Sequence, residues 1–271
     1  MKIDYISDVH LDFYVKLKNL SKTEKQLKLL INKILPDEPS EVLIIAGDLS
    51  HYNHLTIKFL TLLKEIYKEI YFVLGNHDMY LVSGSQKKIY GNSISRIIDL
   101  EDRVKELEDV FLLRGEVKNI LGTDIKIGGC MGWYQIHGFI DVERWRQVSN
   151  DSRMIYISNY KFQQNYWLEN YEKDQAQKLK DIAEEGCDIL VTHVPQIPWN
   201  SEHGNSKYIG SPDNIFYWNN RFNLIKDINP KVYVFGHTHD NYNFKLNDIE
   251  FKCNPLGYPG ETLNKIETFE I

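Results

Sequence analysis

The chain has 271 residues, of which 42% are hydrophobic and 26% charged, which is typical of a globular protein that can bury a sizeable core. Its net charge of −6 gives no basic footprint, which argues against binding nucleic acid by phosphate neutralisation. No apolar run approaches the roughly 18–20 residues of a membrane span, so no membrane partner is expected.

The use of cysteine indicates the compartment. Cys130, Cys187 and Cys253 are odd in number and widely spread, and no pair has zinc-ribbon or redox spacing. This pattern is typical of a reducing environment. Residues 1–6 alternate like a strand and lack the apolar core of a signal peptide. We therefore expect a cytoplasmic protein.

The first part of the chain predicts strands that alternate with helices. Ser21 and Glu24 have the spacing of a capping box, and Pro36 ends the helix that they begin. The continuous apolar run at 42–46 is typical of a strand buried on both faces. In chain order we expect a strand at 3–6, a helix at 21–36, a strand at 42–46, a helix at 54–68 and a strand at 70–74. Such alternation favours a largely parallel sheet with right-handed crossovers.

The rest of the chain is less regular. The stretch 131–167 is rich in aromatic and charged residues and lacks linker composition, so we interpret it as an insertion beside the site, within a single domain of residues 1–271. Asn247-Asp248 fits the turn of a hairpin. We expect a helix and then a short strand within 104–113, a strand at 125–128, a helix at 171–184, a strand at 189–192, a loop at 195–213, a strand at 232–235, and antiparallel strands at 242–246, 250–253 and 266–271 that close a second sheet.

Five of the predicted strands end in residues with metal-binding side chains. The five motifs are Asp8-Val9-His10, Gly47-Asp48, Gly75-Asn76-His77-Asp78, Thr192-His193 and Gly236-His237-Thr238-His239. Each of the first four motifs alone is more typical of a turn or a capped strand end, whereas Gly236-His237-Thr238-His239 alone fits a metal site equally well. Ligands of parallel sheets gather at the carboxyl ends of the strands, and paired histidines after a buried strand cost solvation unless they bind something. Five such motifs in order therefore predict one convergent site.

The combined side chains favour a pair of metal ions. Two carboxylates, one amide and four imidazoles come together: Asp8, His10, Asp48, Asn76, His193, His237 and His239. These hard and borderline ligands suit manganese first, with iron or zinc as alternatives. Two divalent ions about 3.5–4 Å apart can lower the pKa of a shared water and hold both reacting oxygens of an in-line displacement. The set therefore predicts hydrolysis of a phosphoester.

The motifs span residues 8–239 and resemble the full motif set of the calcineurin-like metallophosphoesterase superfamily. Gly132-Trp133-Tyr134 and the segment 253–258 are similar to elements of its small cytosolic bacterial and phage-type members. The resemblance implies an α/β fold, a four-layer α/β/β/α sandwich of two mixed sheets flanked by helices. It also implies two ligand groups that share Asp48: Asp8, His10, Asp48 and His239 on one ion, and Asp48, Asn76, His193 and His237 on the other. His77 would be the catalytic residue, facing the substrate and helping the leaving oxygen depart.

Departures from the superfamily pattern bear on the substrate. Gly47-Asp48 continues as Leu49-Ser50-His51, unlike the aspartate-arginine-glycine continuation of protein serine/threonine phosphatases, and no arginine follows His77. Both departures argue against a phosphoprotein held by an arginine clamp. We expect a phosphodiester in a nucleotide or a similar small molecule. The alternatives are a phosphomonoesterase acting on a small phosphorylated metabolite and a non-catalytic scaffold, although a scaffold should have lost ligands.

Four polar residues near the motifs have two interpretations each. Asp12 and His51 could support the ligands, but exposed turn residues are commoner at such positions. Asp78 could brace its loop or orient His77. His203 could contact substrate, although a solvated loop histidine is the commoner case.

The walls of the pocket are expected on two segments. Trp133, Tyr134 and His137 follow the strand at 125–128, whose end should lie near the other strand ends. The loop 195–213 follows His193 directly. We expect these segments to overhang the metals, with Trp133 stacking on a base; the alternative is that Trp133 packs in the core. The sequence does not predict an oligomeric state.

Overall fold

Two mixed β-sheets form the centre of the computed structural model, which describes residues 1–17, 19–198, 210–261 and 264–271. The first sheet has the order β11 (Glu267–Glu270), β1 (Lys2–Ile6), β2 (Val42–Ala46), β3 (Glu69–Val73) and β4 (Val110–Leu112). The second has the order β5 (Val117–Asn119), β6 (Lys126–Cys130), β7 (Ile189–Thr192), β8 (Val232–Phe235), β10 (Ile249–Cys253) and β9 (Tyr242–Leu246).

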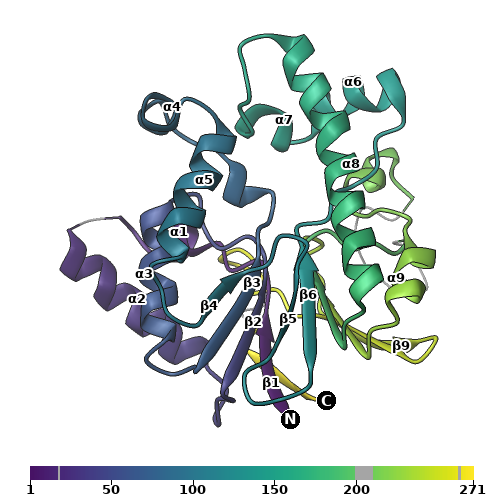
Figure 1. Ribbon diagram of the computed structural model, residues 1–271. Helices are drawn as coiled ribbons and strands as arrows, with labels where there is room; N and C mark the ends of the chain where they lie inside the picture. The colour runs from purple at the N-terminus through teal and green to yellow at the C-terminus, as the bar shows by residue number, and fades with distance from the viewer. Residues whose placement is uncertain (18, 199–209, 262–263) are drawn as a thin grey trace.

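Helices cover the outer face of each sheet (Figure 1). The helices beside the first sheet are α1 (Leu11–Tyr14), α2 (Leu20–Ile34), α3 (Asn53–Leu63), α4 (Gly84–Tyr90) and α5 (Ser93–Val104). Those on the side of the second sheet are α6 (Gly138–Val148), α7 (Asp151–Met154), α8 (Lys161–Glu185) and α9 (Phe222–Ile228). The predicted α/β/β/α sandwich is confirmed. No helix in the described part of the chain is long and apolar enough to cross a membrane.

The burial of β2 explains its unbroken apolar sequence. Leu43 and Ile45 belong to the core between the first sheet and its helices, whereas Val42, Ile44 and Ala46 belong to the core between the two sheets. Successive strand residues point to opposite faces, so a strand that is covered on both sides needs apolar residues at every position.

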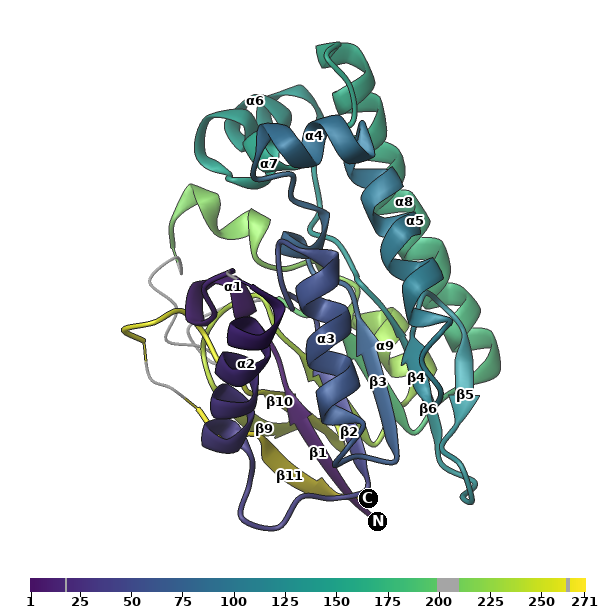
Figure 2. The same ribbon diagram turned by 90° about the vertical axis from the view of Figure 1, so that its left-hand side faces the viewer.

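The parallel strands bring their carboxyl ends to one end of the molecule. Strands β1 to β4 are parallel to one another, as are β6, β7, β8 and β10. The chain termini lie together at the opposite end, and α4, α6 and α7 lie beyond the carboxyl ends in both views (Figures 1 and 2). The predicted stretch 131–167 therefore sits over the end where the motifs emerge.

Helix boundaries differ from several predictions. The side chain of Asn19 accepts a hydrogen bond from the backbone N–H of Lys22, so Asn19, and not the expected capping box, begins α2. Helix α3 ends at Leu63 instead of residue 68. Helix α8 begins at Lys161, ten residues before the predicted start at 171. The helix predicted within 104–113 is wrong, because α5 ends where that segment begins.

The last strand lies in the first sheet, whereas the sequence predicts it in the second. Strand β11 pairs antiparallel with β1 in the first sheet, so the prediction that it closes the second sheet is wrong. The β9–β10 hairpin is confirmed, and its turn residues Asn247 and Asp248 have φ of 49° and 64°, as a tight hairpin turn requires. Strand β10 also pairs with β8, in parallel.

Candidate metal centre

The structure brings all seven expected ligands together at the carboxyl ends of both sheets. Asp8 and His10 follow β1, and Asp48 and Asn76 follow β2 and β3. From the second sheet, His193 follows β7, and His237 and His239 follow β8. His237 and His239 are partly exposed, and the other five are buried.

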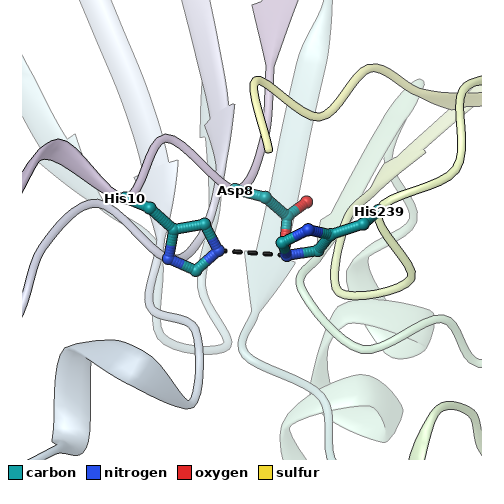
Figure 3. Close-up of side chains that lie close together, drawn as sticks. All are labelled: Asp8, His10 and His239. Atoms are coloured by element: carbon teal, nitrogen blue, oxygen red, sulfur yellow. Dashed lines mark hydrogen bonds and ion pairs between the residues drawn. The ribbon is translucent and has the colours of Figure 1, made fainter. Parts of the chain in front are cut away.

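One group of donor atoms lies between β1 and β8. Nε2 of His10 and Nε2 of His239 are 3.0 Å apart, and the latter is 3.6 Å from Oδ1 of Asp8 (Figure 3). Donors about 2.1 Å from one ion are separated by roughly 3.0–3.4 Å in octahedral or tetrahedral geometry. The spacing and the donor chemistry therefore fit a divalent ion.

A second group lies around Asn76. Its Oδ1 is 3.0 Å from Nε2 of His193 and 3.1 Å from Nδ1 of His237. Oδ2 of Asp48 lies between the groups, 3.4 Å from Nε2 of His193 and 3.8 Å from Nε2 of His10. A carboxylate in this place can reach both clusters.

Three histidines have their outer ring nitrogen fixed by an oxygen. Nδ1 of His193 lies 2.8 Å from the carbonyl oxygen of Ala46, and Nε2 of His237 lies 3.0 Å from that of Phe216. Nδ1 of His239 lies 3.0 Å from Oε2 of Glu261. Each of these nitrogens donates its hydrogen outward, so the neutral form of the ring has the lone pair of its other nitrogen toward the centre. This is the tautomer that a metal ligand needs.

The backbone at the ligands is strained. Nine non-glycine residues in the described ranges have positive φ, and five of them are expected ligands: Asp8, His10, Asp48, His237 and His239. Such conformations cost about 1–3 kcal/mol each and cluster where function requires a fixed side chain. The loops are therefore shaped to direct these side chains.

Two motif glycines leave room for the carboxylates. A Cβ on Gly75 would lie 2.1 Å from Oδ1 of Asp48, and a Cβ on Gly236 would lie 2.7 Å from Oδ2 of Asp8. No side chain fits at either position while the carboxylates stay in place. The glycines of these motifs are thus required by close approach between loops.

The charges of the ligand side chains favour a cation. Burial lowers the pKa of His10 to about 4. Burial also acts to lower the pKa of His193, but the adjacent Asp48 carboxylate outweighs it and raises that pKa to about 9. Burial acts to raise the pKa of Asp48, yet the neighbouring imidazoles, His193 first, hold it well below its usual range. An ionised Asp48 thus faces a proton on His193, which a metal ion would displace.

His77 is linked to Asp12 through His51. Nδ1 of His77 lies 2.9 Å from Nε2 of His51, whose Nδ1 lies 2.7 Å from Oδ2 of Asp12. Burial acts to raise the pKa of Asp12, but hydrogen bonding from His51 lowers it to about 2. The expectation that Asp12 and His51 are exposed turn residues is wrong, because His51 is buried against His77.

Asp78 braces the loops around it. Its carboxylate accepts hydrogen bonds from the backbone N–H groups of Asp48 (3.0 Å), Leu49 (3.2 Å) and Gly75 (2.8 Å). Burial and the nearby charge of Asp48 raise the pKa of Asp78 to about 6. Of its two interpretations, the structure supports the loop brace.

A cavity of about 520 Å³ opens beside the ligands. Its lining includes the two β8 histidines, the segment 148–151, and residues far apart in sequence: Asp48, Asn76, His77, Tyr80, Asp213, Phe216, Tyr217, Asp240, Tyr258 and Glu261. The prediction that Trp133, Tyr134 and His137 form a wall is wrong. Trp133 and Tyr134 are completely buried in the core, and His137 is exposed outside this cavity. The stretch 131–167 does reach the cavity, but through 148–151.

The loop 195–213, which is expected to form the second wall of the pocket, is described only in part. Of the loop 195–213, Asp213 lines the cavity, and residues 199–209 lie outside the described residues. The expectation for His203 therefore falls outside them as well.

Sequence reasoning did not assign roles to three residues beside the centre. Glu261 contacts His239, Asp151 contacts Asn76, and the ring of Tyr258 stacks on His10 with centroids 4.5 Å apart. Tyr258 lies in a segment that the resemblance singled out. Asp151 begins the four-residue helix α7 and Glu261 lies in an irregular stretch, and no periodicity or motif marks either residue.

Comparisons with known proteins agree with this architecture. The family model of the calcineurin-like phosphoesterases matches residues 1–241. Uncharacterized protein L509 of Acanthamoeba polyphaga mimivirus is 24% identical over 277 residues, covering 96% of this chain and 92% of its own length. The crystal structure of the phosphopantetheinyl hydrolase PptH from Mycobacterium tuberculosis matches with a TM-score of 0.68 and 19% identity, covering 96% of this chain and 90% of that one.

The family model covers most of the chain and includes all five motifs. The neighbour from Mycobacterium tuberculosis has the same fold. The Asp and His clusters can hold metal ions, as the chemistry of this family requires. The chain belongs to the calcineurin-like phosphoesterase family and is a metal-dependent phosphoesterase.

Proposed function

We propose that this phosphoesterase is a phosphodiesterase acting on small diesters, with nucleotides first among the candidates. The observation that carries the proposal is the charge of the cavity. Five carboxylates line it, those of Asp48, Asp151, Asp213, Asp240 and Glu261, and no lysine or arginine of the described ranges does. A monoester carries between one and two negative charges at neutral pH, whereas a diester carries one. Asp48 is a proposed metal ligand and Asp213 pairs with Arg144. The remaining carboxylates of the lining, those of Asp151, Asp240 and Glu261, therefore disfavour the second charge of a monoester.

Two ions are proposed, with Asp48 shared between the two groups of donors. Manganese is the first choice, and iron and zinc are the alternatives, because the donors are carboxylates, an amide and imidazoles. When bound, such ions would lower the pKa of the attacking water and offset the charge of the phosphoryl oxygens. Metal analysis of the purified protein tests both the number and the identity of the ions.

His77 is the proposed proton donor to the leaving oxygen. Its Nδ1 is held by His51, and its Nε2 lies 4.0 Å from Oδ2 of Asp48 and 3.4 Å from the hydroxyl of Tyr258. Nε2 is thus the ring nitrogen at the ligand cluster, where the scissile bond would lie. Burial lowers the pKa of His77 well below its usual range, so the neutral ring with its hydrogen on Nδ1 is the resting form. To act as the acid, the ring would take up a second proton on Nε2, beside the anionic substrate, and pass that proton to the oxygen that departs.

Two aromatic rings that line the cavity suit a base or a similar flat group. Tyr217 and Tyr258 line the cavity, and the ring of Tyr217 lies 5.5 Å from that of His237. These rings replace the expected Trp133 as candidates for stacking, because both are partly exposed.

A pair of chromogenic substrates tests the preference for diesters. With Mn²⁺, kcat/KM should be higher for bis-p-nitrophenyl phosphate than for p-nitrophenyl phosphate. The reverse order would support the phosphomonoesterase alternative. Nucleotide diesters belong in the next panel. A phosphopantetheinyl diester belongs there too, because the fold neighbour from Mycobacterium tuberculosis is a phosphopantetheinyl hydrolase.

A further inference from the structure

The first turn of α7 carries a buried carboxylate beside the metal centre. Asp151 is 4% exposed and accepts three hydrogen bonds from side chains. Oδ1 accepts from Nδ2 of Asn76 at 2.7 Å and from the hydroxyl of Tyr80. Oδ2 accepts from the hydroxyl of Tyr134 at 2.7 Å. A buried carboxylate is costly unless such donors surround it, so its presence here needs a reason.

The hydrogen bond from Asn76 decides which end of its amide faces the centre. Nδ2 can only donate, and Oδ1 can only accept or bind a cation. With Nδ2 held by Asp151, Oδ1 lies 3.0 Å from Nε2 of His193 and 3.1 Å from Nδ1 of His237. Rotation of the amide by 180° would place an NH₂ group where an ion needs an oxygen. Asp151 excludes that rotamer, because its carboxylate has no hydrogen to donate.

Asp151 is itself fixed by the core of the stretch 131–167. Nε1 of Trp145 donates to the hydroxyl of Tyr134 at 2.5 Å, and that hydroxyl donates to Asp151. Trp145 and Tyr134 are completely buried. A chain of hydrogen bonds thus runs from α6 through Tyr134 and Asp151 to Asn76.

We propose that Asp151 is a positioning residue for one of the two metal ions, the ion held by Asn76, His193 and His237. The proposal rests on the metal centre of the proposed function. It gives the aromatic-rich stretch 131–167 a definite role, which is to hold the Asn76 amide in its ligand orientation. Partners that orient a ligand in this way typically contribute 10–100-fold to metal affinity.

Titration calorimetry of Mn²⁺ into metal-free protein tests the proposal. The wild type should bind two ions, and Asp151→Ala should bind one of them about 10–100-fold more weakly. Asp151→Asn should lose less affinity than Asp151→Ala, because its amide oxygen can still accept from Nδ2 of Asn76, although its NH₂ no longer excludes the flipped amide. The matched control is Asp141→Ala, which removes another first-turn aspartate of the same stretch, one that contacts the N–H of His137 and not the cavity. It should bind both ions like the wild type.

A double-mutant cycle separates positioning from general loosening of the fold. If Asp151 acts through the amide, Asp151→Ala should not weaken metal binding further when Asn76 is already alanine. Additive losses in the double variant would overturn the proposal, and so would wild-type affinity in Asp151→Ala. A wild type that binds no metal would instead refute the proposed function. Far-UV circular dichroism and Tm of each variant check that it is folded before titration.

Discussion

Nε2 of His51 lies 2.9 Å from Nδ1 of His77, and the two rings stack with their centroids 5.0 Å apart. Because Nδ1 of His51 faces the carboxylate of Asp12, that nitrogen carries hydrogen and Nε2 of His51 is left to accept. Nδ1 of His77 must then be the donor. The ring of His77 is thereby fixed with its Nε2 toward Asp48, whose Oδ2 lies 4.0 Å away.

Replacement of His77 should separate chemistry from metal binding. His77→Ala should keep both ions but slow turnover by about 10²–10⁴-fold, the usual contribution of a general acid. The loss should be smaller for p-nitrophenolate esters, because that leaving group departs without a proton. Steady-state rates on esters of nitrophenol and of a simple alkanol measure the difference. Equal losses on both would indicate that His77 holds phosphate instead.

His51 should act through His77. A hydrogen bond of this kind contributes about 0.5–1.5 kcal/mol, so His51→Ala should lower kcat on alkyl esters by roughly 2–10-fold with little change in KM. In a His77→Ala background the same change should have no further effect. His54→Ala is a matched control, because His54 is an exposed histidine in the first turn of α3, only three residues after the buried His51. If His51→Ala lowered kcat as much in the His77→Ala background as in the wild type, His51 would not act through His77.

The sequence predicts the strands and their ligand motifs well because both are local. The apolar run at 42–46 and the glycine-flanked motifs after each strand need no partner to be recognised. Long-range contacts could not be predicted in this way. His51 is held by a hydrogen bond to Asp12, 39 residues earlier. Asn76 is oriented by a hydrogen bond to Asp151, 75 residues later. Neither pairing leaves a periodic signal in the chain.

The predictions of helix boundaries and of the sheet that the last strand joins failed for related reasons. The first turns of α8 are rich in exposed aromatic and polar residues, which hide its apolar periodicity. Strand β11 has only one buried residue, Phe269, so its pattern does not indicate which sheet it joins. Its place beside β1 is decided by tertiary pairing.

Replacement of Asp48 should empty both metal sites. Its Oδ2 lies 3.4 Å from Nε2 of His193 and 3.8 Å from Nε2 of His10, one donor from each group. Asp48→Ala should therefore reduce bound metal from about two ions per chain to less than one. Elemental analysis of protein purified in Mn²⁺ measures this. Retention of one ion at full affinity would show that Asp48 is not shared.

Metal binding should release a proton from His193. The pKa of His193 is raised from 6.5 to about 9, so its protonated form stabilises the metal-free fold fully below pH 6.5, and this contribution is lost as pH rises through 9. At pH 7 the proton must leave when Nε2 binds a metal ion. Apparent affinity for Mn²⁺ should thus increase between pH 7 and 9. Calorimetry in buffers of different ionisation enthalpy counts the protons, and an absence of buffer dependence at pH 7 would contradict the assignment.

Trp133 and Tyr217 should give opposite phenotypes, because one packs in the core and the other lines the cavity. Trp133 is completely buried, with its ring centroid 4.4 Å from that of Tyr134 and 5.1 Å from that of Tyr171. Trp133→Ala should lower the free energy of unfolding by about 3–5 kcal/mol. Where the protein still folds, its activity toward all substrates should change to the same extent.

Tyr217→Ala should keep its Tm close to that of the wild type. Stacking of one base on an aromatic ring contributes about 1–3 kcal/mol, which corresponds to a rise in KM of roughly 5- to 150-fold for a nucleotide diester. Methyl p-nitrophenyl phosphate, which has no base, should be hydrolysed as before. Thermal melts and KM values for both substrates, measured on both variants, decide the matter. An unchanged KM for nucleotides in Tyr217→Ala would show that this wall does not bind a base, and the substrate would then be sought among diesters without one.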